Sequence, residues 1–254
     1  MSKSNFTNNT ILYLQRIIKR MYLGIFGPIV LNKFIHDFKI QQLNLSSINE
    51  LYDLLDKFNK YHIKISLMQT KSEFIYLLKL LKKRKIKNIL EIGTADGGTL
   101  FFFSKIIDRN GYMISVDLPG NRFNRFPDWK IPLLLSFKCG HQKLFIIRSD
   151  SHQLSTYNKI SKIIKDHGKL DLIFIDGDHS YSGVKKDFLL YKNLISKNGI
   201  IAFHDIAKKG DHNLVGDVPK FWNELKEKYI IQEIIENPNQ IGCGIGILLE
   251  RKSY

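Results

Sequence analysis

Residues 88–100 read NILEIGTADGGTL, a short apolar run that contains one acid and leads into closely spaced glycines. Such a run before glycines is typical of a buried parallel strand that turns directly into a helix. Gly93 and Gly97 allow the backbone to turn sharply and are expected to leave room for a ligand against it. In an open parallel sheet, ligands bind beyond the carboxyl ends of the strands, so this loop is a candidate binding site.

The same pattern recurs along the chain after this stretch. Further apolar runs are YMISVD (112–117), KLFIIRSD (143–150), LDLIFIDGD (170–178) and GIIAFHD (199–205), and helix-like stretches separate them. Continuous apolar strands between amphipathic helices indicate a parallel sheet covered on both faces. Residues 230–250 contain two strand-like runs joined by Asn-Pro-Asn, which predicts an antiparallel hairpin. The predicted fold is α/β, a Rossmann-like sheet of parallel strands closed by this C-terminal hairpin.

A basic helical extension, residues 1–68, is expected to precede the main domain, residues 69–254. Residues 1–87 hold 16 Lys and Arg against 5 Asp and Glu, so most of the net charge of +15 lies there. Such an excess is typical of a segment that faces an anionic partner, although a lysine-rich composition on solvated faces gives the same count. The apolar run 21–31 is too short to span a bilayer. We expect a cytoplasmic protein whose residues 1–68 are candidates for peripheral contact with the inner face of the membrane or for homo-oligomer contacts.

The composition, with 44% apolar and 25% charged residues, is ordinary for a globular protein. Cys139 and Cys243 are the only cysteines, which sets neither a disulfide framework nor a zinc-binding spacing and favours a reducing compartment. Neither is expected at the ligand-facing end of a strand, which argues against a cysteine nucleophile.

Thr70 and Glu73 form a capping-box pattern that predicts the start of the helix before the first strand.

The glycine loop departs from the dinucleotide fingerprint G-x-G-x-x-G. Ala95 stands where the middle glycine would let a pyrophosphate approach. Glu91 and Asp96 add negative charge, which would repel a pyrophosphate and attract a cofactor that carries an ammonium and a sulfonium. These features argue against a nicotinamide-dependent dehydrogenase. A plain tight strand-to-helix turn is the alternative interpretation of the loop.

Acids also end the next two strands. Asp117 follows Gly97 by twenty residues, and an acid there can accept both ribose hydroxyls of an adenosine cofactor. Asp150 and Ser151 end the third run and are available to an adenine ring, although Ser151 is also expected to open a helix. Acids at the ends of three successive strands are harder to explain as caps than as ligand contacts.

At this point the chain resembles a known family. LEIGTADGGT (90–99), ISVD (114–117), RSDS (148–151) and FIDGDHSYSGVKKDF (174–188) are similar to motifs of the class I S-adenosylmethionine-dependent methyltransferases. The closer likeness is to the bacterial group called methyltransferase domain 24, which has cephalosporin-hydroxylase-like and sugar O-methyltransferase relatives. The resemblance covers residues 69–250, and residues 1–68 match no family that we can name.

The resemblance implies which residues bind S-adenosyl-L-methionine. Glu91, Gly93 and Gly97 would line its methionine part, Asp117 would bind ribose, and Asp150 with Ser151 would face adenine. The candidate cofactor-binding set is completed by residues beside these in the loops and after the fourth strand: Thr94, Ala95, Asp96, Leu118 and Asp176.

Titratable side chains after the fourth and fifth strands should meet at the same sheet edge: Asp176, Asp178, His179, His204 and Asp205. Two carboxylates and a histidine can bind a divalent metal, here Mg²⁺ or Mn²⁺. The resemblance places Asp176, His204 and Asp205 where metal-dependent O-methyltransferases hold magnesium, although an oxygen ligand is usual in place of His204. Without a metal, His179 or His204 could accept the proton of an acceptor hydroxyl. The sequence leaves both mechanisms open. Asp178 is a further catalytic candidate that, with Ser180, is also expected to cap a helix.

The expected reaction is O-methylation of a hydroxyl on a saccharide or small secondary metabolite. The long connection 118–142, with Arg122, Arg125 and Trp129, is a candidate wall of the acceptor pocket, and the segment after residue 207, with His212, is a candidate for the opposite wall. No Asn-Pro-Pro-Tyr-like motif follows the fourth strand, so nucleic acid is not the expected partner. The alternatives are an RNA methyltransferase, favoured by the charge, and a non-catalytic membrane-associated protein that keeps the fold.

Overall fold

The structure is a computed structural model that describes residues 31–41, 47–58, 65–119, 128–207 and 216–251. The chain forms two compact units, Met1–Lys64 with Asp128–Ser136, and Ile65–Pro127 with Phe137–Tyr254. The domain boundary expected after residue 68 stays a prediction. No helix in these described ranges has the length and apolar character needed to cross a membrane.

The first unit is helical where it is described. It contains a helix over residues 31–41, α2 (Ile48–Phe58), a 3₁₀ turn (Asp128–Lys130) and α5 (Ile131–Leu135). The ring of Phe58 on α2 packs edge-on against Phe34 and Phe38, with ring centroids 5.0 and 5.2 Å apart. Ser47 and Glu50 form a reciprocal capping box at the start of α2, with hydrogen bonds of 2.8 and 3.2 Å between their side chains and backbone N–H groups.

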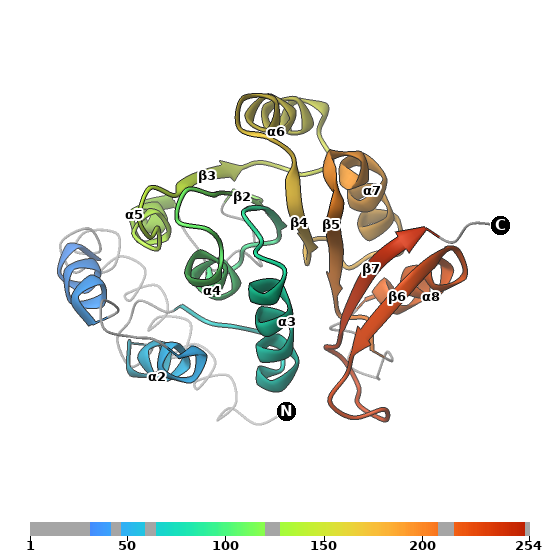
Figure 1. Cartoon of the computed structure of the whole chain (residues 1–254), viewed down its shortest axis with the longest axis horizontal. Helices are drawn as coiled ribbons and strands as arrows, with labels where there is room; N and C mark the ends of the chain where they lie inside the picture. The colour runs from blue at the N-terminus through green and yellow to red at the C-terminus, as the bar shows by residue number, and fades with distance from the viewer. Residues whose placement is uncertain (1–30, 42–46, 59–64, 120–127, 208–215, 252–254) are drawn as a thin grey trace, which may run out of the picture. The chain divides into compact units, whose positions relative to one another are not determined.

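The second unit contains the predicted alternation of strands and helices (Figure 1). Its elements are α3 (Lys71–Lys83), β1 (Asn88–Ile92), α4 (Gly98–Ile106), β2 (Tyr112–Asp117), β3 (Lys143–Arg148), α6 (Leu154–His167), β4 (Leu170–Ile175), α7 (Tyr181–Tyr191), a 3₁₀ turn (Lys192–Leu194), β5 (Ile195–His204), α8 (Val218–Lys228), β6 (Tyr229–Ile234) and β7 (Ile245–Arg251).

The strands form one seven-stranded sheet in the order β3-β2-β1-β4-β5-β7-β6. The strands from β1 to β5 pair in parallel, whereas β7 runs antiparallel between β5 and β6. The predicted Rossmann-like sheet with a closing C-terminal hairpin is therefore confirmed. Because β7 is antiparallel to β5, the residues just before β7 lie at the same edge as the residues just after β5.

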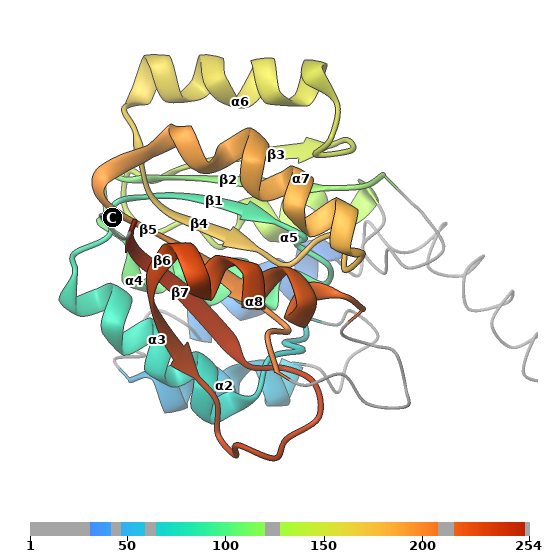
Figure 2. The ribbon, with the colours of Figure 1, turned by 90° about the vertical axis from the view of Figure 1, so that its right-hand side faces the viewer.

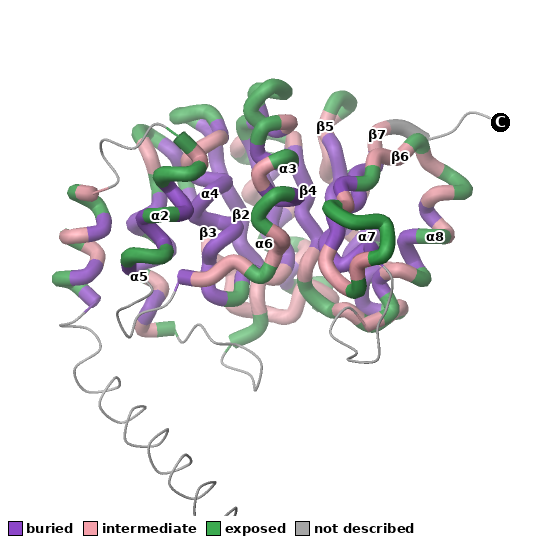
Figure 3. Tube along the Cα trace, turned by 90° about the horizontal axis from the view of Figure 1, so that it is seen from below, coloured by how far each residue is buried: buried purple, intermediate pink, exposed green. Residues whose placement is uncertain are grey.

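Helices cover both faces of this sheet (Figure 2). On one face, apolar side chains of α6, α7 and α8 form a continuous core with β1, β2, β4 and β5. On the other face, Phe74 of α3 contacts Phe102 of α4, and Phe103 of α4 contacts Phe174 of β4. Strand β1 is buried along its whole length, and β4 along almost all of it (Figure 3), which explains why they read as mostly apolar runs.

The helix start predicted from Thr70 and Glu73 is confirmed, because α3 begins at Lys71, but the capping-box hydrogen bonds do not form. Thr70 occupies the N-cap position but makes no side-chain capping hydrogen bond. Glu73 is 2% exposed and instead turns toward the loop between β6 and β7. Tertiary hydrogen bonds with that loop therefore replace the local ones that the sequence pattern predicts.

Candidate active site

The loop after β1 is held against the end of β4. Gly93 has a φ of +92°, and a side-chain carbon there would lie 1.9 Å from the carbonyl oxygen of Asp176. Residue 93 must therefore be a glycine, because any side chain would clash with the Asp176 backbone. The backbone of Asp176 thus occupies the position that a side chain on residue 93 would take, and the contact of Gly93 with a ligand stays a prediction.

The second half of the same loop is anchored to residues that precede α3. Asp96 is 3% exposed and accepts a 2.5 Å hydrogen bond from the hydroxyl of Ser66. Gly97, with a φ of +83°, starts α4, and a side-chain carbon on Gly98 would lie 2.3 Å from the carbonyl oxygen of Ser66. The carboxylate of Asp96 therefore anchors the loop.

Glu91 is fully buried, which changes its expected role. Thr99 donates a hydrogen bond to Glu91 Oε1, while Glu91 Oε2 has no partner among the described residues. Burial raises the pKa of Glu91 to about 8, and the hydrogen bonds from Thr99 and Thr94 offset only part of that rise. At neutral pH the group is therefore mostly protonated, so the charge that we expected it to present to a cationic cofactor is largely absent.

Asp117, at the end of β2, lies across from the glycine loop. Its Oδ2 accepts a hydrogen bond from the backbone N–H of Ala95 and its Oδ1 accepts one from Leu118, both at 2.7 Å. Burial raises the pKa of Asp117, whereas these backbone donors and Arg148 lower it. Each oxygen keeps a second lone pair, so the carboxylate can still accept two ribose hydroxyls.

The segment after β3 is a turn and not yet a helix. Helix α6 begins at Leu154 with Gln153 as its N-cap, so the expectation that Ser151 opens a helix is wrong. Asp150 Oδ1 accepts a 2.8 Å hydrogen bond from the N–H of His152. The hydroxyl of Tyr191 on α7 donates a 2.6 Å bond to the carbonyl of Ser151. These bonds fix Asp150 and Ser151 at the carboxyl edge of the sheet.

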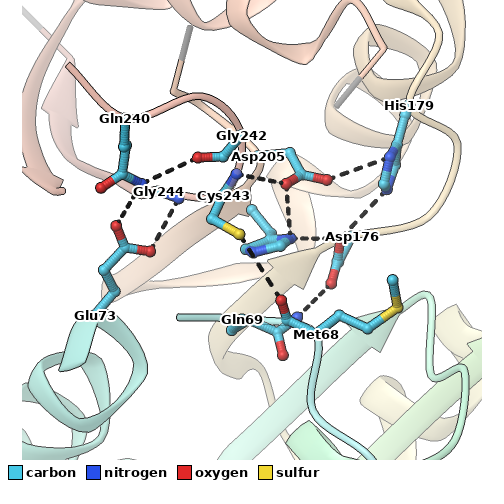
Figure 4. Close-up of polar contacts among 11 residues, drawn as sticks. Met68, Gln69, Glu73, Asp176, His179, Asp205, Gln240, Gly242, Cys243 and Gly244 are labelled. Carbon is cyan, nitrogen blue, oxygen red and sulfur yellow. Dashed lines mark hydrogen bonds and ion pairs between the residues drawn. The ribbon is translucent and has the colours of Figure 1, made fainter. Parts of the chain in front are cut away.

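Four of the five titratable side chains that were expected to meet at this edge do so beyond β4 and β5: Asp176, His179, His204 and Asp205. Figure 4 labels Asp176, His179 and Asp205. His204 Nδ1 lies 3.1 Å from Asp176 Oδ1 and 3.4 Å from Asp205 Oδ1. His179 Nε2 lies 3.4 Å from Asp176 Oδ1, and its Nδ1 lies 3.3 Å from Asp205 Oδ2. The two acids thus face both histidines, and we call these four residues the His–Asp cluster.

Asp176 and His204 form a buried ion pair within the His–Asp cluster. Burial alone would raise the pKa of Asp176, but the charge of His204 and the hydrogen bonds from both histidines hold it well below its usual range. Burial would likewise lower the pKa of His204, but the charge of Asp176 and hydrogen bonds with Asp176, Asp205 and Cys243 hold it well above 6.5. The pair with Asp176 therefore favours the protonated form of His204, which makes it a poorer proton acceptor. His179, with a side chain 33% exposed, is the histidine that solutes can reach.

Cys243 belongs to the same site, so our expectation that neither cysteine lies at a ligand-facing strand end is wrong. Its backbone N–H donates a 3.2 Å hydrogen bond to Asp205 Oδ1, and its thiol lies 3.8 Å from the carbonyl oxygen of Met68. The signal that could have found it is the position of Cys243 just before β7, at the carboxyl edge of β5.

Gln69 is a second residue that the sequence did not reveal. Its side-chain amide donates a 2.7 Å hydrogen bond to Asp176 Oδ2 across a separation of 107 residues. No periodicity or motif connects these two positions, so only the fold brings them together.

Asp178 lies apart from the His–Asp cluster in the contacts that the structure describes. Its Oδ1 accepts a 2.8 Å hydrogen bond from the N–H of Ser180, and its side chain lies against Gly183. Ser180 is the N-cap of α7 and accepts a 3.0 Å bond from Gly183. The capping role expected for the Asp178–Ser180 pair is thus present, and the catalytic role of Asp178 stays a prediction.

Two groups of side chains could each hold a metal ion, because the ligand atoms within each group lie within 4.8 Å of one another. One group is Asp176, His179 and Asp205, and the other is His204, Asp205 and Cys243. The two carboxylates fit a Mg²⁺ or Mn²⁺ ion, which prefers oxygen ligands. His204 Nδ1 lies 3.1 Å from Asp176 Oδ1 and so already faces a carboxylate, and the role of His204 as a metal ligand stays a prediction.

The predicted acceptor walls are only partly described. Arg122, Arg125 and His212 lie outside the described residues. The long connection after β2 does carry elements of its own, the 3₁₀ turn that contains Trp129 and helix α5. The role of these residues in an acceptor pocket stays a prediction.

Comparison with known proteins supports the interpretation of the sheet and its loops. Residues 90–206 match the model of a family described as a methyltransferase domain. An uncharacterised protein of Acanthamoeba polyphaga mimivirus is 50% identical over 36 residues, which span 14% of this chain and 16% of the viral protein.

Solved structures share the fold at low identity. An O-methyltransferase of Streptomyces achromogenes, involved in tomaymycin synthesis and in complex with S-adenosylmethionine, is 14% identical, with a TM-score of 0.55 over 83% of this chain and 93% of its own. An O-methyltransferase of Bacillus cereus in complex with S-adenosylhomocysteine is 14% identical, with a TM-score of 0.50 over 83% and 95%. A protein of Clostridium thermocellum described as an rRNA methylase candidate is 16% identical, with a TM-score of 0.50 over 73% and 100%. At these identities the likeness establishes the fold and leaves the acceptor open.

Proposed function

The chain carries a class I S-adenosylmethionine-dependent methyltransferase domain, and from this premise we propose that it methylates a hydroxyl group on a saccharide or another small metabolite. The observation that carries the proposal is the position of His179. Its two ring nitrogens face Asp176 Oδ1 at 3.4 Å and Asp205 Oδ2 at 3.3 Å. A half-exposed histidine between two carboxylates is suited to take a proton from an acceptor hydroxyl.

The donor would lie along the carboxyl ends of β1, β2 and β3. S-adenosylmethionine supplies an electrophilic methyl group on a positively charged sulfur. Asp117 would accept the ribose hydroxyls, and Asp150 with Ser151 would face the adenine. The loop of Gly93, Thr94 and Ala95 would lie beside the methionine part. Support comes from the two backbone hydrogen bonds that fix the Asp117 carboxylate beside Ala95.

The acceptor would lie beside the His–Asp cluster. A hydroxyl has a pKa far above 7, so its proton must leave as the new carbon–oxygen bond forms. His179 would receive that proton, and the carboxylates of Asp176 and Asp205 would stabilise the resulting imidazolium. His204 keeps Asp176 ionised, because the two form a buried ion pair at 3.1 Å.

Divalent-metal assistance is part of the proposal. Asp176 and Asp205 are the oxygen donors that would hold Mg²⁺ or Mn²⁺, and such an ion lowers the pKa of a hydroxyl bound to it. This chemistry would support the role of His179, since a more acidic hydroxyl transfers its proton more readily.

The test is methyl transfer from isotope-labelled S-adenosylmethionine to a panel of saccharides and small hydroxyl compounds, with structured RNA in parallel. Labelled saccharide or metabolite, lost in the His179→Gln variant, is the expected result. Label in RNA alone would replace this proposal with the RNA methyltransferase that the charge of residues 1–87 favours. Failure to bind S-adenosylmethionine in calorimetry would favour the non-catalytic alternative.

We further propose that residues 1–68 contact an anionic membrane surface, for which liposome flotation of the full chain is the test.

A further inference from the structure

We propose that Glu73 is a positioning residue that holds Asp205 in place through the loop of residues 236–244. The inference rests on the proposed function, because it assigns Asp205 to the site of proton removal. Glu73 and the whole of this loop lie outside residues 90–206, the part of the chain that matches the methyltransferase family.

Glu73 is a buried anchor for the loop. Its side chain is 2% exposed. Its Oε1 accepts hydrogen bonds from the backbone N–H of Glu236 at 3.0 Å and from the side-chain amide of Gln240 at 2.7 Å. Its Oε2 accepts a 3.0 Å bond from the N–H of Gly244. One side chain on α3 therefore ties both ends of the loop, as Figure 4 shows for Gln240 and Gly244.

The anchored loop in turn holds the end of β5. The N–H of Cys243 donates to Asp205 Oδ1 at 3.2 Å, and the N–H of Ala207 donates to the carbonyl of Cys243 at 2.9 Å. The N–H of Ile206 also donates to the carbonyl of Gly244 at 3.4 Å, so the two residues that follow Asp205 are both bonded to this loop. The same segment therefore holds the carboxylate of Asp205 and the backbone just after it.

Asp205 and Cys243 both adopt the left-handed backbone conformation, which contacts with neighbouring residues must stabilise. Asp205 has a φ of +63° and Cys243 a φ of +56°. The left-handed region is disfavoured for most residues with a side chain, and such residues persist where the surroundings hold them. Without the loop contacts, we expect Asp205 to relax and its carboxylate to move away from His179 and His204.

The chemistry of residue 73 must be that of a carboxylate. Two acceptor oxygens meet three N–H donors in the structure. A glutamine has nearly the same shape, but it offers one acceptor oxygen and would direct its own N–H₂ group at one of the donors. Glu73→Gln therefore releases part of the loop while leaving the apolar packing of α3 intact.

A matched control lies next to Glu73 on the same helix. The hydroxyl of Ser72 donates a 2.7 Å hydrogen bond to Glu236 Oε1, an exposed contact with the same loop. Ser72→Ala removes a link between α3 and the loop but leaves the buried anchor in place.

The experiment is NMR spectroscopy of histidine ring nitrogens in the full chain, with His179 and His204 assigned from their glutamine variants. Both rings lie within 3.4 Å of Asp205, so their signals should shift in Glu73→Gln and stay at wild-type positions in Ser72→Ala. A merely structural role for Glu73 would lower stability without moving these signals. Unchanged His179 and His204 signals in a folded Glu73→Gln chain would overturn the proposal.

Two further measurements keep the result decisive. If Glu73→Gln does not fold, Gln240→Ala removes one of the three donors and should move the same signals by less, and unchanged signals would again overturn the proposal. Calorimetry with S-adenosylmethionine tests the proposed function separately. Signals that shift in a chain that does not bind the donor would support the anchor and contradict the function.

Discussion

The side-chain amide of Gln69 donates a 2.7 Å hydrogen bond to Asp176 Oδ2, while both histidines of the His–Asp cluster face the other oxygen of the same carboxylate. Asp176 therefore has a partner on each oxygen. Gln69→Leu should lower the free energy of unfolding by about 1–3 kcal/mol, because a largely buried charge loses a donor. Urea unfolding measures the change. Gln232→Leu, which removes a 3.0 Å bond to Tyr76 at the surface, should change stability by less than about 0.5 kcal/mol, and equal effects of the two variants would contradict the argument.

Asp117→Ala should weaken the binding of S-adenosylmethionine about 100–10,000-fold. The substitution removes a charged acceptor for two hydroxyls, and each such bond contributes about 1.5–3 kcal/mol. Calorimetry with the donor gives the dissociation constant. Asp108→Ala is the control, because Asp108 caps the turn before β2 by accepting the N–H of Asn110, at the opposite edge of the sheet. Donor affinity that is the same in both variants and in the wild type would remove Asp117 from the ribose site.

The two histidines of the His–Asp cluster should respond differently to substitution. His179→Gln should reduce methyl transfer about 100–10,000-fold with little change in stability, since a half-exposed base is removed. His204→Gln should lower stability by about 3–5 kcal/mol, because Asp176 is left as a largely buried charge without its partner. Turnover and urea unfolding of each variant give both quantities. Transfer at the wild-type rate in His179→Gln would assign proton removal to another group.

Glu91 should make the chain less stable as pH rises. Its folded pKa of about 8 lies above its ordinary value of 4.5, so between these values the folded chain keeps a proton that the unfolded chain loses. The free energy of unfolding should therefore fall through this window and level off above about pH 8. Glu91→Gln removes the titration, and its advantage over the wild type should grow by about 3–5 kcal/mol across the window. Urea unfolding at several pH values without the donor measures it, and a pH-independent difference would show that Glu91 is ionised.

Removal of divalent ions should lower methyl transfer. A chelator would take away the ion that Asp176 and Asp205 hold, and added Mn²⁺ should restore the rate. Binding of Mn²⁺, followed by electron paramagnetic resonance, should be lost in Asp205→Asn and kept in Asp166→Asn, a substitution on the exposed side of α6. A rate that does not respond to the chelator would leave proton removal to His179 alone.

The sheet could be predicted from the sequence because its strands are buried on both faces. Continuous apolar runs such as LDLIFI need no knowledge of their neighbours to be recognised. The order of the predicted strands places Asp176, His179, His204 and Asp205 at one edge, as the structure does. This part of the site follows from topology alone.

The remainder depends on contacts between distant segments. The pattern of Thr70 and Glu73 predicts a local cap, but Glu73 pairs with residues more than 160 positions away. The charge of Glu91 also depends on burial that its motif does not reveal. Hydrogen bonds between residues that lie far apart in the chain form only in the folded protein, and they leave no periodic pattern in the sequence.

The residues of the site come partly from the range that matches the methyltransferase family and partly from the segments on either side of it. The hydrogen bonds to the Asp117 carboxylate arise within residues 90–206, whereas Gln69, Glu73 and Cys243 join from either side of that range. A fragment trimmed to the family-matching range would retain the ribose acid and yet lose every described bond that these flanking residues make to the acids beyond β4 and β5. Substitutions at these flanking residues should therefore change catalysis while they leave donor affinity unaltered.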